Sequence, residues 1–391
     1  MTERIYHSDA YCREITARIT AKESREGLFR LRLERTIFRP EGGGQPADHG
    51  TINGLPLLGL ENDRDDVVHV LGLDPGEGDL RLVLDFVGRY DHMQQHTAQH
   101  LLSQVLVRDF AAATLSFAIG PEHSSIETGR PDFSEEEIRA LEAECARRVF
   151  AALPVRVFAS DDPSTLHLRK PPKVPGRIRV VEIEGFDQSA CGGTHVRNSA
   201  EIGPLKILRS ERVRSNARLY YAAGGRALRD HQQKHEVVQR LQRLITQPLA
   251  DIPAQVQALL KERDDLRREL QQARRRQMEQ EARDAIADSG AVVVREFSGC
   301  AAADLRRFAL AVMQGGRHVL AFQKEGPPCI LIGRGPGDFD LRRLSGRIFT
   351  LLDGRGGGGA NLLEGRGNDL SHLDEVVELL RDHLERRGPG A

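Results

Sequence analysis

The chain has 391 residues, of which 56 are basic and 57 acidic, giving a formal net charge of −1. That length predicts two to four domains. The near-zero net charge excludes a positive field over the whole molecule as the means of binding nucleic acid, so any such binding would depend on local basic patches. Five scattered cysteines exclude a disulfide framework. Together with the lack of a signal-peptide pattern or an apolar run of roughly 20 residues, they predict a soluble, cytoplasmic protein that does not engage a membrane.

Residues 1–88 are predicted to form a small antiparallel β-barrel. Apolar and polar side chains alternate from Phe29 to Thr36 and again from Leu80 to Phe86, the two-residue period typical of a half-buried strand. Asn53-Gly54 and Asp74-Pro75-Gly76 are turn signals between such strands. A barrel or curled sheet is the simplest architecture for this pattern.

A glycine-rich segment interrupts the β region at Gly42, Gly43 and Gly44, and Gln45 follows it. Consecutive glycines allow the backbone to approach a ligand closely and expose N–H groups to an anion or a carbonyl. A glutamine side chain both donates and accepts hydrogen bonds. The segment is not a Walker loop, because no Gly-Lys-Ser/Thr follows. A flexible loop between strands is the alternative interpretation.

His96 and His100 lie four residues apart in a segment predicted to be helical. At about 100° per residue they share one face, whereas the apolar residues between Ala98 and Val105 lie roughly opposite and would pack. Asp91 is a candidate N-cap for this helix. His92 falls on the same face as the pair, so spacing alone leaves open which two histidines could bind a metal.

A second pair of candidate ligands, Cys191 and His195, is separated by Gly192-Gly193-Thr194. Two glycines suit a tight loop that turns both side chains toward one point. Together the two pairs offer three nitrogens and one sulfur, a set that suits one tetrahedral Zn2+ ion per chain. Each pair alone is common in proteins without a metal, and four protein ligands also suit a closed structural site.

The residues between the two helical histidines argue against zincin-type proteolysis. A zincin carries a glutamate there as its general base, whereas this chain has Thr97, Ala98 and Gln99. Hydrolysis at such a centre would depend on the effect of the metal on water or substrate, or on a base from the substrate. One helix and a distant loop are an unusual origin for a structural zinc, so catalysis or substrate positioning is the favoured role.

Downstream of the first histidine pair the pattern alternates between strands and helices. Residues 110–133 predict two short strands, 134–151 an amphipathic helix opened by a Ser134–Glu137 capping box, and 201–222 a hairpin. The basic loop 166–179 could contact a phosphate backbone. A solvated loop is the alternative.

The C-terminal part separates into a helical segment and an α/β domain. Apolar residues at three- and four-residue spacing through 226–289 predict a helical hairpin with coiled-coil character. From 290 to 391 short apolar runs alternate with helical segments, which is typical of an α/β fold. The glycine-rich run 353–359 is predicted to be a loop that could lie against RNA or a neighbouring domain.

Three stretches together resemble the AlaX-type alanyl-tRNA editing proteins, free-standing relatives of the editing domain of alanyl-tRNA synthetase. They are TIFRPEGGGQPADHG (36–50), RYDHMQQHTAQHLLS (89–103) and IEGFDQSACGGTHVRNSAEIGPLKI (183–207). The run DGRGGGGANLLEGRG (353–367) is similar to the glycine-rich motif of the DHH-associated domain. The resemblance extends over nearly the whole chain and points to the long form of the family.

The resemblance implies an enzyme that hydrolyses, in trans and without ATP, tRNA-Ala mischarged with serine and in some members glycine. Mischarged tRNA-Ala would be the partner, with a possible homodimer through the helical or C-terminal region. The role of residues 290–391 would be tRNA binding or dimerisation. No class II synthetase region precedes the editing motifs, so we expect no tRNA charging.

The resemblance also implies roles for particular residues. The glycine-rich motif would line the aminoacyl site, with Gly42, Gly43 and Gly44 binding substrate and Gln45 and Thr36 acting in catalysis. The resemblance also implies that His92 is not a metal ligand. The residues that correspond to the zinc ligands of the family are His96, His100, Cys191 and His195.

Two rival functions stay open from the sequence. Threonyl-tRNA synthetases carry a related editing domain, so the substrate could belong to the threonine system. A non-catalytic zinc and tRNA-binding protein is the second rival, since the chain departs from the synthetase motif at Arg39, where an aromatic residue is common, and at 361–367.

The predicted fold class is a multidomain α+β protein with four parts. They are a β-barrel-like domain with the glycine-rich motif (1–88), a zinc-binding editing domain (89–225), a helical segment (226–289) and a DHH-associated-like α/β domain (290–391).

Overall fold

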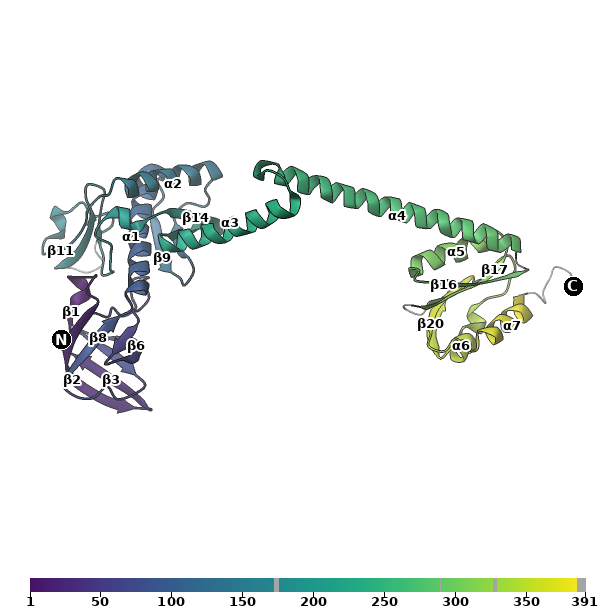
Figure 1. The fold of residues 1–391 in the computed structure, drawn as a ribbon, viewed down its shortest axis with the longest axis horizontal. Helices are drawn as coiled ribbons and strands as arrows, with labels where there is room; N and C mark the ends of the chain where they lie inside the picture. The colour runs from purple at the N-terminus through teal and green to yellow at the C-terminus, as the bar shows by residue number, and fades with distance from the viewer. Residues whose placement is uncertain (172–175, 289, 326–328, 385–391) are drawn as a thin grey trace. The chain divides into compact units, whose positions relative to one another are not determined.

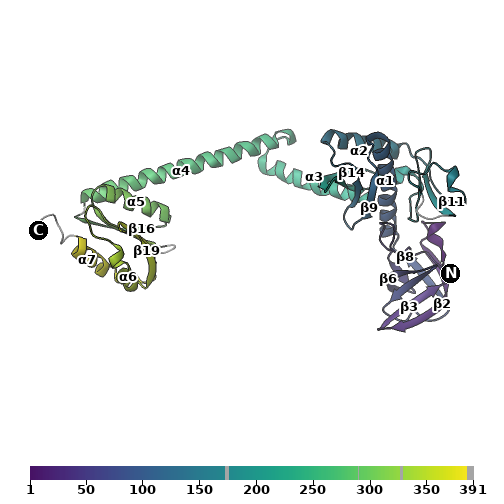
Figure 2. The same ribbon diagram turned by 180° about the vertical axis from the view of Figure 1, so that it is seen from behind.

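The computed structural model describes residues 1–171, 176–288, 290–325 and 329–384 (Figure 1). The chain divides into two compact units, Met1–Leu241 and Gln242–Ala391, here called the N-terminal and C-terminal units. Both contain helices and sheets, which confirms the mixed α+β multidomain class (Figures 1 and 2). Among the described residues, no helix is long and apolar enough to cross a membrane.

Six antiparallel strands near the N-terminus close on themselves in the order β2-β3-β7-β6-β5-β8. Alternate residues such as Leu31, Leu33, Leu80 and Leu82 are buried inside, as the two-residue period requires. Asn53 and Gly54 both have positive φ in the turn that joins β5 to β6. The strands are β2 (Glu14–Arg25), β3 (Leu28–Leu33), β5 (Gly50–Ile52), β6 (Leu55–Asp63), β7 (Asp66–Leu71) and β8 (Asp79–Leu84), beside a β1 (Glu3–Arg4) to β4 (Arg35–Thr36) pair.

Helix α1 (Phe86–Phe110) follows β8 almost directly and carries the first histidine pair. Its N-cap is Asp85, whose side chain accepts from the backbone N–H groups of Val87 and Gly88. The N-cap predicted at Asp91 is therefore wrong. Because the preceding strand ends at Leu84, the helix begins well before the position that its histidine pattern suggested.

Two sheets and a second helix surround α1. The residues from Gln95 to Ser103 are all buried, so the histidine face is covered as completely as the apolar face. Helix α2 (Glu135–Phe150) begins with the predicted capping box. The sheets are β14 (Leu205–Val213), β15 (Asn216–Ala223), β10 (Ser124–Thr128), β9 (Thr114–Ile119) and, separately, β11 (Val155–Ser160), β12 (Ile178–Ile183), β13 (Asp187–Ala190), with short 3-10 turns η1 (Ile5–His7), η2 (Pro163–Thr165) and η3 (Ser199–Ile202).

The predicted helical segment consists of two helices. Helix α3 (Gly225–Ile245) is followed by Thr246, which has a positive φ of 55°. After the short η4 (Leu249–Asp251), helix α4 (Ile252–Asp288) begins with Pro253 in its first turn, a position that proline tolerates because its missing N–H would be unpaired there.

The C-terminal unit is built on a five-stranded sheet in the order β16-β17-β18-β20-β19. Helix α5 and the end of α4 cover one face, and α6 and α7 cover the other (Figures 1 and 2). The elements are β16 (Val292–Ser298), α5 (Ala302–Gln314), β17 (His318–Glu325), β18 (Cys329–Gly333), α6 (Arg342–Leu351), β19 (Gly354–Gly358), β20 (Leu362–Gly367) and α7 (Leu373–Leu384).

The loop predicted at 353–359 is wrong, because Gly354–Gly358 form strand β19 and pair with β20. Glycine disfavours strands in general, but here the sheet packs against Phe349 of α6. A Cβ on Gly356 or Gly365 would overlap that ring. The glycines are therefore required by close packing rather than by loop flexibility.

Candidate metal centre

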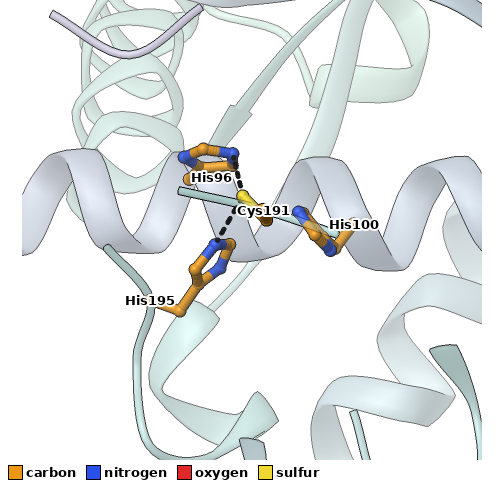
Figure 3. Close-up of side chains that lie close together, drawn as sticks. All are labelled: His96, His100, Cys191 and His195. Atoms are coloured by element: carbon orange, nitrogen blue, oxygen red, sulfur yellow. Dashed lines mark hydrogen bonds between the residues drawn. The ribbon is translucent and has the colours of Figure 1, made fainter. Parts of the chain in front are cut away.

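Four side chains from two distant segments converge on one point in the N-terminal unit (Figure 3). His96 and His100 come from α1, and Cys191 and His195 from the loop that follows β13. One donor atom from each lies within 4.8 Å of the others. The Cys191 Sγ is 3.4 Å from the Nε2 atoms of both His96 and His195. His92 is not part of this cluster.

The glycines of the Cys191–His195 loop differ in what surrounds them. A Cβ on Gly193 would overlap the ring of His96, whereas a Cβ on Gly192 would meet nothing within 4 Å. The Gly193 N–H also donates to the Cys191 Sγ at 3.3 Å. The loop thus passes against the His96 ring only because Gly193 has no side chain.

Gln45 of the glycine-rich segment orients His96. Its Oε1 lies 2.9 Å from His96 Nδ1 and accepts from the Thr194 N–H at 3.1 Å, while its Nε2 donates to the Thr194 hydroxyl at 2.8 Å. The amide oxygen therefore faces His96, and His96 Nδ1 must carry the proton. Its Nε2 is left with a lone pair directed at the cluster.

The other two histidines are oriented in the same way. Thr97 donates its hydroxyl proton to the Met93 carbonyl at 2.8 Å, so its oxygen can only accept from His195 Nδ1, 3.2 Å away. His100 Nδ1 lies 3.1 Å from the buried carboxylate of Asp187. All three rings therefore direct Nε2 at the cluster, which is the arrangement of buried hydrogen-bond partners that metal-binding histidines have.

The protonation states also suit a metal. Burial alone raises the pKa of the Cys191 thiol, but its interactions with His96, His195 and His100 outweigh burial and hold that pKa well below its usual value. Burial lowers the pKa of His96 and of His195. Burial also acts to lower the pKa of His100, but the interactions of His100 with Asp187 and Cys191 outweigh burial and raise that pKa overall. A thiolate beside imidazoles with free Nε2 lone pairs is a donor set that a metal can take without further rearrangement.

The cluster opens onto a cavity of about 760 Å³. Gly42 and Gly43 line it together with the cluster residues His96, His100 and Cys191, whereas Gly44 and Gln45 do not. Gly44 instead packs against Phe117. A Cβ on Gly44 would lie only 2.7 Å from the carbonyl oxygen of Phe117. The other cavity-lining groups that bear charge or a titratable ring are Arg4, Tyr6, His7, Arg39, Glu41, Arg169 and Lys170.

Thr36 does not line this cavity. It is fully buried in the barrel region, where its hydroxyl is 2.8 Å from Nε2 of His69 and accepts from the Phe38 N–H at 3.1 Å. The Nδ1 of His69 faces the Leu31 carbonyl, so Nε2 accepts the Thr36 proton. Of the residues predicted from the sequence, Gly42 and Gly43 line the cavity beside the cluster and Gln45 contacts His96, whereas Gly44 and Thr36 do neither.

Arg39, which the sequence did not single out as a site residue, joins the glycine-rich segment to the metal loop. Its guanidinium donates to the carbonyls of Pro40 and Gln45, both at 3.1 Å, to Gly42 at 2.6 Å and, at 3.5 Å, to Gly192. The side chain is 5% exposed. The position of Arg39 three residues before the glycines was the one available signal, but it does not reveal the contact with a loop 153 residues away.

Known proteins resemble this chain over most of its length. Residues 178–220 match the family model described as the threonyl and alanyl tRNA synthetase second additional domain. The alanyl-tRNA editing protein AlaX-L of Pyrococcus horikoshii is 30% identical, covering 98% of this chain and 100% of the relative. Aarsd1 of Danio rerio, also an alanyl-tRNA editing protein, is 31% identical over 90% of this chain and 88% of its own.

A longer relative is matched in part. The alanine–tRNA ligase of Pyrococcus abyssi is 28% identical across 96% of this chain, and the match covers 43% of the ligase. The two relatives that are matched over most of their own length are thus alanyl-tRNA editing proteins, in agreement with the motifs around the two ligand pairs. This chain belongs to the family of alanyl-tRNA editing proteins.

Proposed function

We propose that this chain hydrolyses the ester that joins serine, and as a second substrate glycine, to mischarged tRNA-Ala. The family to which it belongs consists of alanyl-tRNA editing proteins. The observation that carries the proposal is the cluster of His96, His100, Cys191 and His195, the first three of which line a cavity of about 760 Å³. A structural metal would have no need of such a cavity.

We assign the metal as zinc, held by these four side chains. Three imidazole nitrogens and one thiolate suit zinc better than magnesium or calcium, which prefer oxygen ligands. A bound zinc ion supplies Lewis-acid polarisation and orientation of the substrate. The chain itself orients each histidine through Gln45, Thr97 and Asp187.

Gly42 and Gly43 are proposed to hold the aminoacyl group, because they line the cavity beside the cluster. Gln45 and Thr36 are proposed to act as positioning residues, since neither lines the cavity: Gln45 orients His96, and Thr36 is fixed by His69. An aminoacyl ester is intrinsically labile, so orientation by backbone donors can accelerate hydrolysis without a strong base from the protein.

A panel of charged tRNAs tests the function. We expect the protein to deacylate Ser-tRNA-Ala. The rates for Gly-tRNA-Ala, Ala-tRNA-Ala and Ser-tRNA-Thr are measured in the same assay. Faster hydrolysis of Ser-tRNA-Thr would move the substrate to the threonine system. Binding of tRNA without hydrolysis of any substrate would support the non-catalytic alternative.

The role of the metal is tested by Cys191→Ala. Loss of one of four ligands should remove most of the zinc, measured by atomic emission. It should slow deacylation of Ser-tRNA-Ala at least about tenfold, the lower end of what losing even a supporting partner of a metal ligand costs. A zinc-free variant that kept the parent rate would show that the metal has no part in the reaction.

A further inference from the structure

A second cavity, of about 420 Å³, adjoins the one that contains the cluster. The two share the segment Ser189–Gly192 and the side chains of Arg169 and Lys170 as lining. A ligand whose reactive end reaches Cys191 could therefore extend along this segment into the second cavity.

The second cavity is lined by four basic side chains and, among the described residues, by no acidic one. They are Arg169, Lys170, Arg177 and Arg179. Arg169 has a buried carboxylate partner, Asp187, at 3.3 Å, although its own Nε makes no hydrogen bond. Arg177 is 3.7 Å from an exposed Asp161 and is itself 72% exposed. All the charged side chains among the described lining residues are therefore cations, two of which lie near a carboxylate outside the lining.

Arg179 is held entirely by backbone carbonyls. Its Nε donates to His7 at 3.3 Å, and one terminal nitrogen donates to Cys191 at 2.7 Å and to Gly193 at 2.8 Å. A guanidinium has five N–H groups, so the two on its other terminal nitrogen have no acceptor among the described residues. No carboxylate of the described chain lies within ion-pair distance of Arg179, which makes it a half-buried cation without a carboxylate counter-ion.

An oriented arginine with spare N–H groups, beside further basic side chains, suits a phosphate group. We propose that the second cavity holds the phosphodiester on the 5′ side of the terminal adenosine of the substrate, with Arg179, Lys170 and Arg177 supplying the positive charge. This rests on the proposed function, in which the ester is carried by the ribose of that same nucleoside. The phosphate would set the register of the nucleoside, so that the ester reaches the cluster.

The test compares two small ligands that differ by one phosphodiester. One is adenosine with serine joined to its ribose by an amide, and the other is the same molecule with a methyl phosphodiester at its 5′ position. Their dissociation constants for the full zinc-loaded chain are measured by calorimetry at several salt concentrations. The matching serine esters report hydrolysis separately.

In the parent protein we expect the phosphodiester to tighten binding about tenfold, in the range of one or two partly exposed charge-assisted contacts. The gain should shrink as the salt concentration rises, because partly exposed charge-assisted contacts are screened by salt. Arg177→Gln and Lys170→Gln should each reduce the gain to about threefold or less. Arg18→Gln is the matched control, because Arg18 is 70% exposed and paired with Asp79 on the barrel and lines neither cavity.

The outcomes separate this inference from the proposed function. Equal binding of the two ligands by the parent, or equal effects of Arg177→Gln and Arg18→Gln, would overturn the phosphate subsite even if the esters are hydrolysed. A phosphodiester gain that depends on Arg177 and Lys170, without hydrolysis of either ester or of Ser-tRNA-Ala, would support the subsite and overturn the proposed function.

Discussion

Gly193 and Gly192 are adjacent residues of the metal loop with opposite surroundings. A Cβ on Gly193 would overlap the His96 ring, whereas one on Gly192 would point into open space. We therefore expect Gly193→Ala to displace His96 and reduce the zinc content from about one ion per chain to well below half. Gly192→Ala should keep its zinc. Atomic emission on the two purified variants checks this, and equal zinc content would contradict the geometry.

His69 should make the stability of the barrel region depend on pH. Complete burial lowers its pKa from 6.5 to about 4. Between these values the unfolded chain binds a proton that the folded chain does not, so stability is fully present above pH 6.5 and is lost as the pH falls toward 4. The loss is at most about 3–4 kcal/mol, since each pKa unit is worth about 1.4 kcal/mol.

Urea unfolding of the parent and His69→Asn between about pH 4 and 7 measures this effect. The variant should show a shallower decline in the free energy of unfolding, whatever its stability at neutral pH. His235→Asn, on the exposed surface of α3, is the control and should decline as the parent does. A parallel decline in the parent and His69→Asn would remove His69 as the cause.

At the scale of an element, strand β19 shows how packing against a neighbouring helix can require a glycine. Its Gly356 backs onto the Phe349 ring, while a Cβ on the adjacent Gly357 would meet nothing within 4 Å. Both lie in the same five-residue strand, so strand propensity changes equally in the two alanine variants. The packing against α6 is the difference that remains.

We expect Gly356→Ala to destabilise the C-terminal unit by about 1–3 kcal/mol, the usual cost of overpacking, and Gly357→Ala by less than about 0.5 kcal/mol, as for other surface substitutions. Hydrogen exchange of peptides from α6 and β20 in the full chain measures the effect. Equal protection in the two variants would show that the Phe349 ring moves aside without any loss of stability.

At the scale of the whole molecule, the metal centre belongs to the N-terminal unit alone. A metal that binds the folded state and not the unfolded one stabilises the unit that contains it. Chelation should therefore weaken hydrogen-exchange protection in α1 and β13 and leave the C-terminal sheet and its helices unchanged. Equal loss of protection in both units would show that they unfold together.

The predicted homodimer and the four domain boundaries remain predictions. Helix α4 leaves Leu259, Leu266 and Leu270 about half exposed, at a spacing compatible with a coiled-coil partner. The division at Leu241–Gln242 falls inside the helical segment predicted at 226–289, so the two units do not test those boundaries.

Features that depend on local spacing could be predicted from the amino-acid sequence. The i, i+4 pair at His96 and His100, the glycine loop at Cys191–His195, the capping box at Ser134 and the strand periods all arise from residues near one another in the chain. These patterns follow from helix and strand geometry, so they could be predicted without knowing what lies opposite.

The residues around the cluster, in contrast, became evident only in the folded chain. Gln45, Thr97 and Asp187 orient the three histidines, and Arg39 joins two loops that are 153 residues apart. The strand at Gly354–Gly358 is likewise set by Phe349 across the fold. Such contacts depend on which surfaces meet when the chain packs, and no local period or propensity encodes them.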